Sequence, residues 1–241
     1  MRDTRKLRYY NGTRKRSLFS ELSRWSITNW LILVNIVFFA ITFLFVFSPE
    51  YLKYLALQPA LFLNGFFWTL LTSMFMHANI FHLFVNMFVL FSLGNLCEKI
   101  IGRKRYLWFY LIAGIIAGIV FVLFAYFFGS TETNSLAERV FGNPLAFAVG
   151  ASGAIFAIAG LFMILTPRLK FMIIFLPFFS LPAYIMIPLV LFVTWLISSG
   201  VGIGIGNSAH FGGFLAGVVY AFYLRRKYKR KTKMIAKYFS E

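Results

Sequence analysis

Long apolar segments that are almost free of charge constrain the fold of this 241-residue chain more than any other feature. Six such segments lie at residues 29–47, 80–98, 106–128, 148–166, 171–198 and 208–224. An apolar helix needs about 20 residues to cross a hydrocarbon core of about 30 Å, and most of these segments are long enough. The sequence therefore predicts an all-α membrane protein built as a bundle of six transmembrane helices.

The amino-acid composition excludes two other classes of protein. Apolar residues make up 60% of the chain, charged residues 13% and aromatic residues 20%. Soluble domains have about 45–50% apolar and about 25% charged residues, and disordered chains are poor in aromatic residues. The single cysteine, Cys97, cannot form a disulfide within the chain. A water-soluble globule and a disordered chain are both excluded.

The distribution of positive charge predicts the orientation in the membrane. Eight of the 24 Lys and Arg residues precede residue 25, and eight more lie from residue 225 onward. The turns after the second and fourth segments are also basic, whereas the alternate loops carry few or no positive charges. Cytoplasmic loops carry an excess of Lys and Arg. We therefore expect both termini in the cytoplasm, a basic tail at residues 1–24, a membrane domain at 25–225 and a second basic tail at 226–241.

The same charges predict partners and location. The anionic inner leaflet attracts each Lys or Arg near its surface by about 1 kcal/mol, so both basic tails should contact membrane lipids. Nucleic-acid binding is not expected, because membrane topology already accounts for the net charge of +17. We expect a multi-pass integral protein of the cell membrane.

The three histidines of the chain, His77, His82 and His210, all fall at or inside the apolar segments. Ionisable side chains in a membrane are costly and usually face the protein interior or a water-filled cavity. In the second segment His82 and Asn86 are four residues apart, so both lie on one helix face and both can donate hydrogen bonds. They could serve a reaction, or they could simply join helices by hydrogen bonding.

Ser152 and His210 lie beside small residues in the fourth and sixth segments. Gly153 with Ala157, and Gly213 with Gly217, form small-xxx-small faces that let two helix backbones approach closely. Close approach is what a Ser–His hydrogen bond of about 2.6–3.2 Å requires. These small residues could instead serve packing alone.

The expected orientation places Ser152, His210, His82 and Asn86 in the outer half of the membrane. From Ser152 to the end of its segment at Thr166 is only about 22 Å of helix at about 1.5 Å per residue. Ser152 should therefore lie below the outer surface, with residues 129–148 dipping into the membrane to meet it. That dip must be covered by protein or open to water.

These groups fit acyl transfer. A serine hydroxyl is a weak nucleophile until a base removes its proton, and His210 could supply that base, because a free imidazole titrates near neutral pH. No carboxylate is placed to orient His210, so the pair would be a dyad, with Phe156 packed against the imidazole. Three donors could stabilise the oxyanion: the backbone N–H of Ser152, the side chain of His82 and the side-chain amide of Asn86. The predicted reaction is peptide-bond hydrolysis inside the membrane.

The chain resembles the rhomboid family of intramembrane serine proteases across its six segments. Three motifs carry the resemblance: Gly150-x-Ser152-Gly153, His77-x4-His82-x3-Asn86 and Ala209-His210-x-Gly212-Gly213. The resemblance implies a six-helix bundle of rhomboid type, Ser152 as nucleophile, His210 as base, and His82, Asn86 and Ser152 in the oxyanion hole. It places Gly150, Ala151, Phe156 and His77 in the lining of the site. It implies single-span membrane proteins as substrates and no cofactor.

Two positions depart from the family pattern. Many relatives have Trp-Arg where this chain has Trp68-Thr69, and relatives often have Tyr at the position of Phe156. The first change affects an anchor of the first outer loop. Phe156 in place of Tyr preserves ring stacking but removes a hydroxyl contact.

Three alternatives remain open at this point. The three histidines could bind zinc, although the chain has no His-Glu-x-x-His motif, and no metal is expected. A catalytically inactive rhomboid-like protein would bind membrane proteins without cutting them. A transporter could use buried histidines as a proton path.

Overall fold

The computed structural model describes residues 25–45, 49–133, 135–173, 176–201 and 206–240. The long helices are α2 (Ile27–Phe45), α6 (Ile80–Ile101), α7 (Arg103–Phe127), α9 (Ser152–Leu165), α10 (Ala183–Val201) and α11 (Asn207–Lys227). Shorter elements are α3 (Pro49–Leu55), α4 (Pro59–Leu63), α5 (Thr69–Thr72), the 3-10 helix η1 (Ser73–Phe75), α8 (Leu136–Phe141), α12 (Lys229–Tyr238) and the strands β1 (Lys170–Ile173) and β2 (Leu176–Pro182). The N-terminal tail predicted at residues 1–24 lies outside the described residues.

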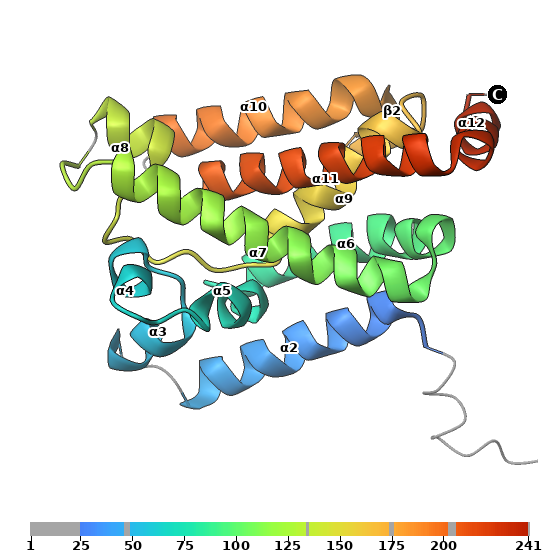
Figure 1. The fold of residues 1–241 in the computed structure, drawn as a ribbon. Helices are drawn as coiled ribbons and strands as arrows, with labels where there is room; N and C mark the ends of the chain where they lie inside the picture. The colour runs from blue at the N-terminus through green and yellow to red at the C-terminus, as the bar shows by residue number, and fades with distance from the viewer. Residues whose placement is uncertain (1–24, 46–48, 134, 174–175, 202–205, 241) are drawn as a thin grey trace, which may run out of the picture.

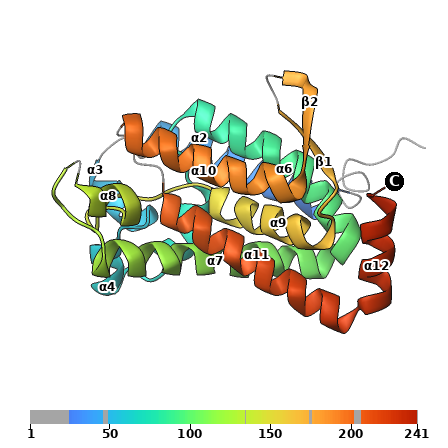
Figure 2. The same ribbon diagram turned by 90° about the horizontal axis from the view of Figure 1, so that it is seen from above.

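Helix α9 occupies the centre of the bundle. Figure 2 shows α9 between α6 and α10 on one side and α7 and α11 on the other, while α2 packs on α6 at the periphery (Figure 1). Ten of its 14 residues are buried. At 14 residues α9 is shorter than the roughly 20 residues of a full membrane crossing.

The long helices present apolar side chains to the outside. Within the described residues, three helices are long and apolar enough to cross a membrane, at Ile27–Leu44, Ile80–Ile101 and Arg103–Phe127. Large exposed side chains on the long helices include Val34, Phe84, Phe88, Trp108, Ile112, Leu189 and Phe192. A soluble monomer rarely exposes so extensive an apolar surface. The molecule is an integral membrane protein.

The prediction of one helical segment at 171–198 is wrong in its first part. Strands β1 (Lys170–Ile173) and β2 (Leu176–Pro182) pair antiparallel, with Lys170 opposite Pro182 and Met172 opposite Ser180, and the helix begins only at Ala183. Proline lacks a backbone N–H and favours an extended conformation in the residue before it. The Phe- and Leu-rich run around Pro177 also suits a strand. The molecule is therefore mostly helical and not all-α.

Helix α12 lies within the basic C-terminal tail predicted at residues 226–241. Thr232 of this helix is buried, and Figure 2 shows α12 turning across the end of α11.

The predicted close contact between the small-residue faces of α9 and α11 is confirmed. A methyl group added at Gly217 would fall on the backbone carbonyl of Ala157, and one added at Gly213 would fall on that of Gly153. The two helices thus touch backbone to backbone. Since His210 is one turn before Gly213, this contact sets how closely His210 approaches α9.

Glu98, near the end of α6, anchors the start of α2. Its carboxylate accepts hydrogen bonds from the backbone N–H groups of Ile27 and Thr28, both at 3.1 Å, and from the Thr28 hydroxyl at 3.2 Å. Arg103 Nε lies 3.6 Å from the same carboxylate. A negative charge at a helix N-terminus is favourable, because the first N–H groups of a helix have no partner within it.

We expect Glu98→Ala to lower the free energy of unfolding by about 3 kcal/mol, because it leaves several buried donors without an acceptor. Thermal unfolding of the purified protein in detergent measures the effect. Glu132→Ala, which removes an exposed carboxylate, is the matched control and should leave the midpoint almost unchanged. Equal midpoints for the two variants would contradict this role of Glu98.

Candidate active site

Ser152 is the first residue of α9, and the backbone before it explains why the helix begins there. Gly150 has a φ of +126°, a conformation that residues with side chains rarely adopt. Its N–H donates to the carbonyl of Ser73 at 2.9 Å. The N–H of Ser152 is therefore among the first N–H groups of a helix, which have no intrahelical acceptor.

The segment that leads to Ser152 is held against the first loop. Leu57 and Ala148 exchange two backbone hydrogen bonds, of 3.1 and 2.7 Å, and Ala60 N–H donates to the carbonyl of Pro144. The segment expected to dip toward Ser152 thus has backbone partners within the protein. Such partners are required wherever irregular backbone lies at membrane depth.

The first loop is itself anchored although Thr69 replaces the arginine of many relatives. Trp68 Nε1 donates to the carbonyl of Tyr54 at 2.8 Å, and the Thr72 hydroxyl donates to that of Leu55 at 2.7 Å. Thr69 is buried, and its hydroxyl donates to the carbonyl of Phe66 at 2.6 Å. Hydrogen bonds within the loop therefore supply anchors of their own.

The structure brings together Ser152 of α9 and His210 of α11, which are 58 residues apart in sequence. Ser152 Oγ lies 2.8 Å from Nε2 of His210, where the hydroxyl can donate a hydrogen bond to the ring nitrogen. The ring of Phe156, one turn along α9, lies 4.5 Å from the His210 ring at an interplanar angle of 31°. Within the described part of the chain, the buried Nδ1 of His210 has no hydrogen-bond partner. The two side chains thus form a Ser–His pair within hydrogen-bond distance, and the Phe156 ring packs against the imidazole.

His82 and Asn86 lie beside the backbone that precedes Ser152. A methyl group added at Gly150 would stand 2.9 Å from Cε1 and 3.0 Å from Nε2 of His82, and 3.7 Å from Nδ2 of Asn86. Asn86 Nδ2 donates to the carbonyl of His82 at 3.1 Å, and its second N–H can serve another acceptor. The absence of a side chain at Gly150 therefore leaves room for both side chains beside the backbone two residues before Ser152.

His77 is buried beside His82, and the two ring centroids are 5.1 Å apart. Among the residues that the structure describes, no three His, Cys, Asp or Glu side chains form a group that could hold a metal ion.

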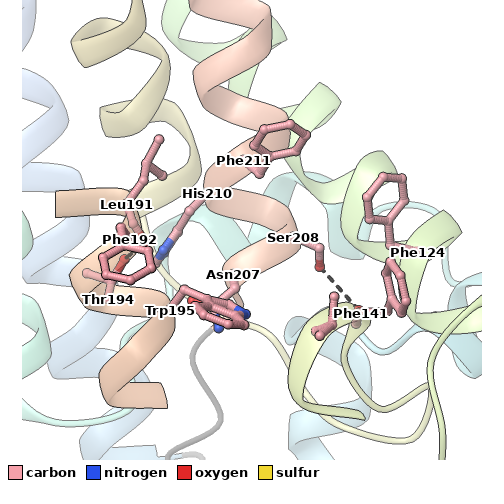
Figure 3. A pocket seen from close by; sticks show the side chains of 11 residues that line it. Phe124, Phe141, Leu191, Phe192, Thr194, Trp195, Asn207, Ser208, His210 and Phe211 are labelled. Carbon is pink, nitrogen blue, oxygen red and sulfur yellow. Dashed lines mark hydrogen bonds between the residues drawn. The ribbon is translucent and has the colours of Figure 1, made fainter. Parts of the chain in front are cut away.

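A cavity of about 310 Å³ opens beside His210 (Figure 3). Its walls come from α7, α8, α10 and α11, and include Phe124, Phe141, Leu191, Phe192, Trp195, Asn207 and Phe211. Ser208 Oγ donates to the carbonyl of Phe141 at 3.4 Å and closes one side. Sequence reasoning missed this cavity, because no motif links residues drawn from four helices.

Comparison with known proteins agrees with these observations. The Rhomboid domain family model matches residues 64–227, more than half of the chain. RHOMBOID-like protein 5 of Arabidopsis thaliana is 31% identical over 176 residues, which cover 73% of this chain and 50% of the relative. Rhomboid protease GluP of Bacillus subtilis is 32% identical over 167 residues, which cover 67% of this chain and 27% of the relative.

A third relative is the human presenilin-associated rhomboid-like protein, mitochondrial. It is 29% identical over 157 residues, which cover 64% of this chain and 37% of the relative. The chain thus spans half or less of the length of these three relatives. The matched region includes α6, α9 and α11, which carry the motifs described above. The chain belongs to the rhomboid family.

Proposed function

We propose that this protein is an intramembrane serine endopeptidase that cleaves single-span membrane proteins through a Ser152–His210 dyad. The observation that carries the proposal is the 2.8 Å separation of Ser152 Oγ and His210 Nε2. A nucleophile within hydrogen-bonding reach of a base is the signature of covalent catalysis by serine. The family also includes a relative whose name states that it is a protease.

In the proposed reaction His210 Nε2 accepts the Ser152 proton as Oγ attacks the scissile carbonyl carbon. The carbonyl oxygen gains the negative charge, which the Ser152 N–H and the side chains of His82 and Asn86 stabilise. His210 then gives its proton to the leaving amine, and the C–N bond breaks. Water, deprotonated by His210, attacks the acyl-enzyme, and the proton returns to Ser152 as the second product leaves.

The proposal includes a topology of six crossings with both termini in the cytoplasm. The basic residues that follow α6 and α11 support it, because they lie where cytoplasmic ends are expected. Ser152 then lies in the outer half of the membrane, and substrates are cut near the outer face. We propose the cell membrane as the location, with the basic tails in contact with anionic lipids and no role for nucleic acid.

Reconstitution in lipid vesicles with a single-span reporter tests the proposal. We expect cleavage that persists in the presence of a chelator, together with covalent labelling of Ser152 by a fluorophosphonate. Binding of the reporter without cleavage or labelling would indicate an inactive rhomboid-like protein. Activity abolished by chelation would contradict a serine mechanism, and proton-coupled transport alone would indicate a transporter.

We expect His82→Ala and Asn86→Ala each to lower kcat by about 10²-fold or more while KM changes little, because oxyanion donors act mainly in the transition state. Initial rates of reporter cleavage measure both constants. Asn95→Ala is the matched control, since Asn95 donates to the carbonyl of Phe91 as Asn86 does to that of His82, but lies far from Ser152 along α6. Equal losses in Asn86→Ala and Asn95→Ala would argue that Asn86 has only a structural role.

A further inference from the structure

We propose that a pocket beside the C-terminal helix α12 binds the head group of an anionic phospholipid. The pocket has a volume of about 400 Å³ and is remote from Ser152. It lies between the turn after α9, the base of the hairpin and the residues after α12, and is lined by Arg168, Leu169, Lys170, Pro182, Tyr184, Phe239 and Ser240. The proposal does not depend on catalysis.

The charge of the lining selects an anion. Arg168 and Lys170 are both exposed at the pocket, and no carboxylate is found among its described lining residues. Arginine presents a planar fork that can bind two phosphate oxygens, and lysine adds a compact charge. The two residues flank Leu169 in sequence, and both line the same pocket.

The backbone around this turn is held in place. Leu169 O accepts from Ala183 N–H at 2.8 Å, and Pro167 O accepts from Tyr184 N–H at 3.2 Å. These bonds tie the turn to the first residues of α10. The backbone that carries the two cations is therefore tied to the start of α10.

The apolar half of the lining favours a lipid over a free anion. Leu169, Pro182 and Phe239 form an apolar wall beside the two cations. The site lies where α9 ends and α10 begins, which is the level of the head groups if these helices end at the membrane surface. A phospholipid has the matching pair of parts, a phosphate and an adjoining apolar region.

Helix α12 supplies the second argument for a membrane ligand. Figures 1 and 2 both place α12 at the same end as the hairpin. Thr232 packs inward, whereas Met234 and Tyr238 are 64% and 76% exposed and, being four residues apart, share one face. Its basic residues are Lys229, Arg230, Lys231, Lys233 and Lys237. A basic helix with exposed apolar side chains is typical of a segment that lies in the head-group layer.

Native mass spectrometry of the full chain in neutral detergent tests the site. Phosphatidylglycerol is titrated against phosphatidylcholine, and inorganic phosphate is added in a separate arm as a competitor. We expect one phosphatidylglycerol to be retained selectively and millimolar phosphate to displace little of it. Equal retention of both lipids, or full displacement by phosphate, would overturn the proposal.

The matched variants remove equal charge inside and outside the pocket. Arg168→Gln with Lys170→Gln should weaken phosphatidylglycerol binding at least about tenfold, whereas Lys231→Gln with Lys233→Gln should change it about twofold or less. Lys170→Arg keeps the charge and should keep binding, and thermal unfolding without added lipid checks that each variant is folded. Equal weakening by both double variants would show diffuse attraction and overturn the site. Cleavage of the single-span reporter is measured separately, so failure of either proposal is visible on its own.

Discussion

Ser152→Ala and His210→Ala each lower the rate of reporter cleavage by on the order of 10⁴-fold or more, if the dyad acts as proposed. Without Ser152 no acyl-enzyme forms, and without His210 the hydroxyl keeps its proton. The 2.8 Å contact between the two groups means that they act as one unit. The double variant should therefore be no slower than either single variant, because effects within a catalytic unit are not additive.

Single-turnover cleavage in vesicles measures these rates, and fluorophosphonate labelling reports on the nucleophile directly. Ser92→Ala is the control, since Ser92 lies on α6 and donates only to the carbonyl of Phe88 among the described contacts. It should retain normal rates. Labelling of Ser152→Ala at the wild-type level, or additive losses in the double variant, would contradict the dyad.

Gly217→Val is the second variant with a large expected effect, and it acts through packing. Its side chain would overlap the backbone of Ala157, which cannot give way as a flexible side chain can. Overpacking in a close-packed interior costs about 1–3 kcal/mol of stability and sometimes more. Because the clash here is with backbone, we expect the cost of Gly217→Val to lie at the upper end of that range. Since α11 also carries His210, separation of the two helices should weaken the Ser152–His210 contact as well.

We expect Gly217→Val to lower both the unfolding midpoint and fluorophosphonate labelling of the fraction that remains folded. Gly217→Ala should have the same effects to a smaller degree. Gly206→Ala is the control, because the added methyl group would lie at an ordinary 3.6 Å from Ala209 Cβ. Normal stability and labelling in Gly217→Val would show that α9 and α11 do not need their close contact.

Several features could be predicted from the sequence because they depend on neighbouring residues. Apolar length placed the long helices α2, α6 and α7 within a few residues of their observed bounds. The spacing of Gly213 and Gly217 predicted the contact with α9. The candidate residues Ser152 and His210 could be selected because polar groups are rare and costly in apolar segments.

The hairpin at residues 170–182 could not be predicted in the same way. Its residues form one apolar run with those of α10, and hydropathy alone does not separate a buried strand from a helix. The prolines at 177 and 182 both lie in strand β2, and Pro182 directly precedes the first residue of α10.

The sequence by itself determined that the chain enters a membrane, which residues could react there, and which helix faces could touch, since hydropathy and side-chain spacing are properties of local sequence. The tertiary structure decided that Ser152 and His210 lie 2.8 Å apart, that Gly150 leaves room for His82 and Asn86, and that a basic pocket forms beside α12. These features join residues far apart in the chain. Their distances depend on how whole helices pack, which no local pattern encodes.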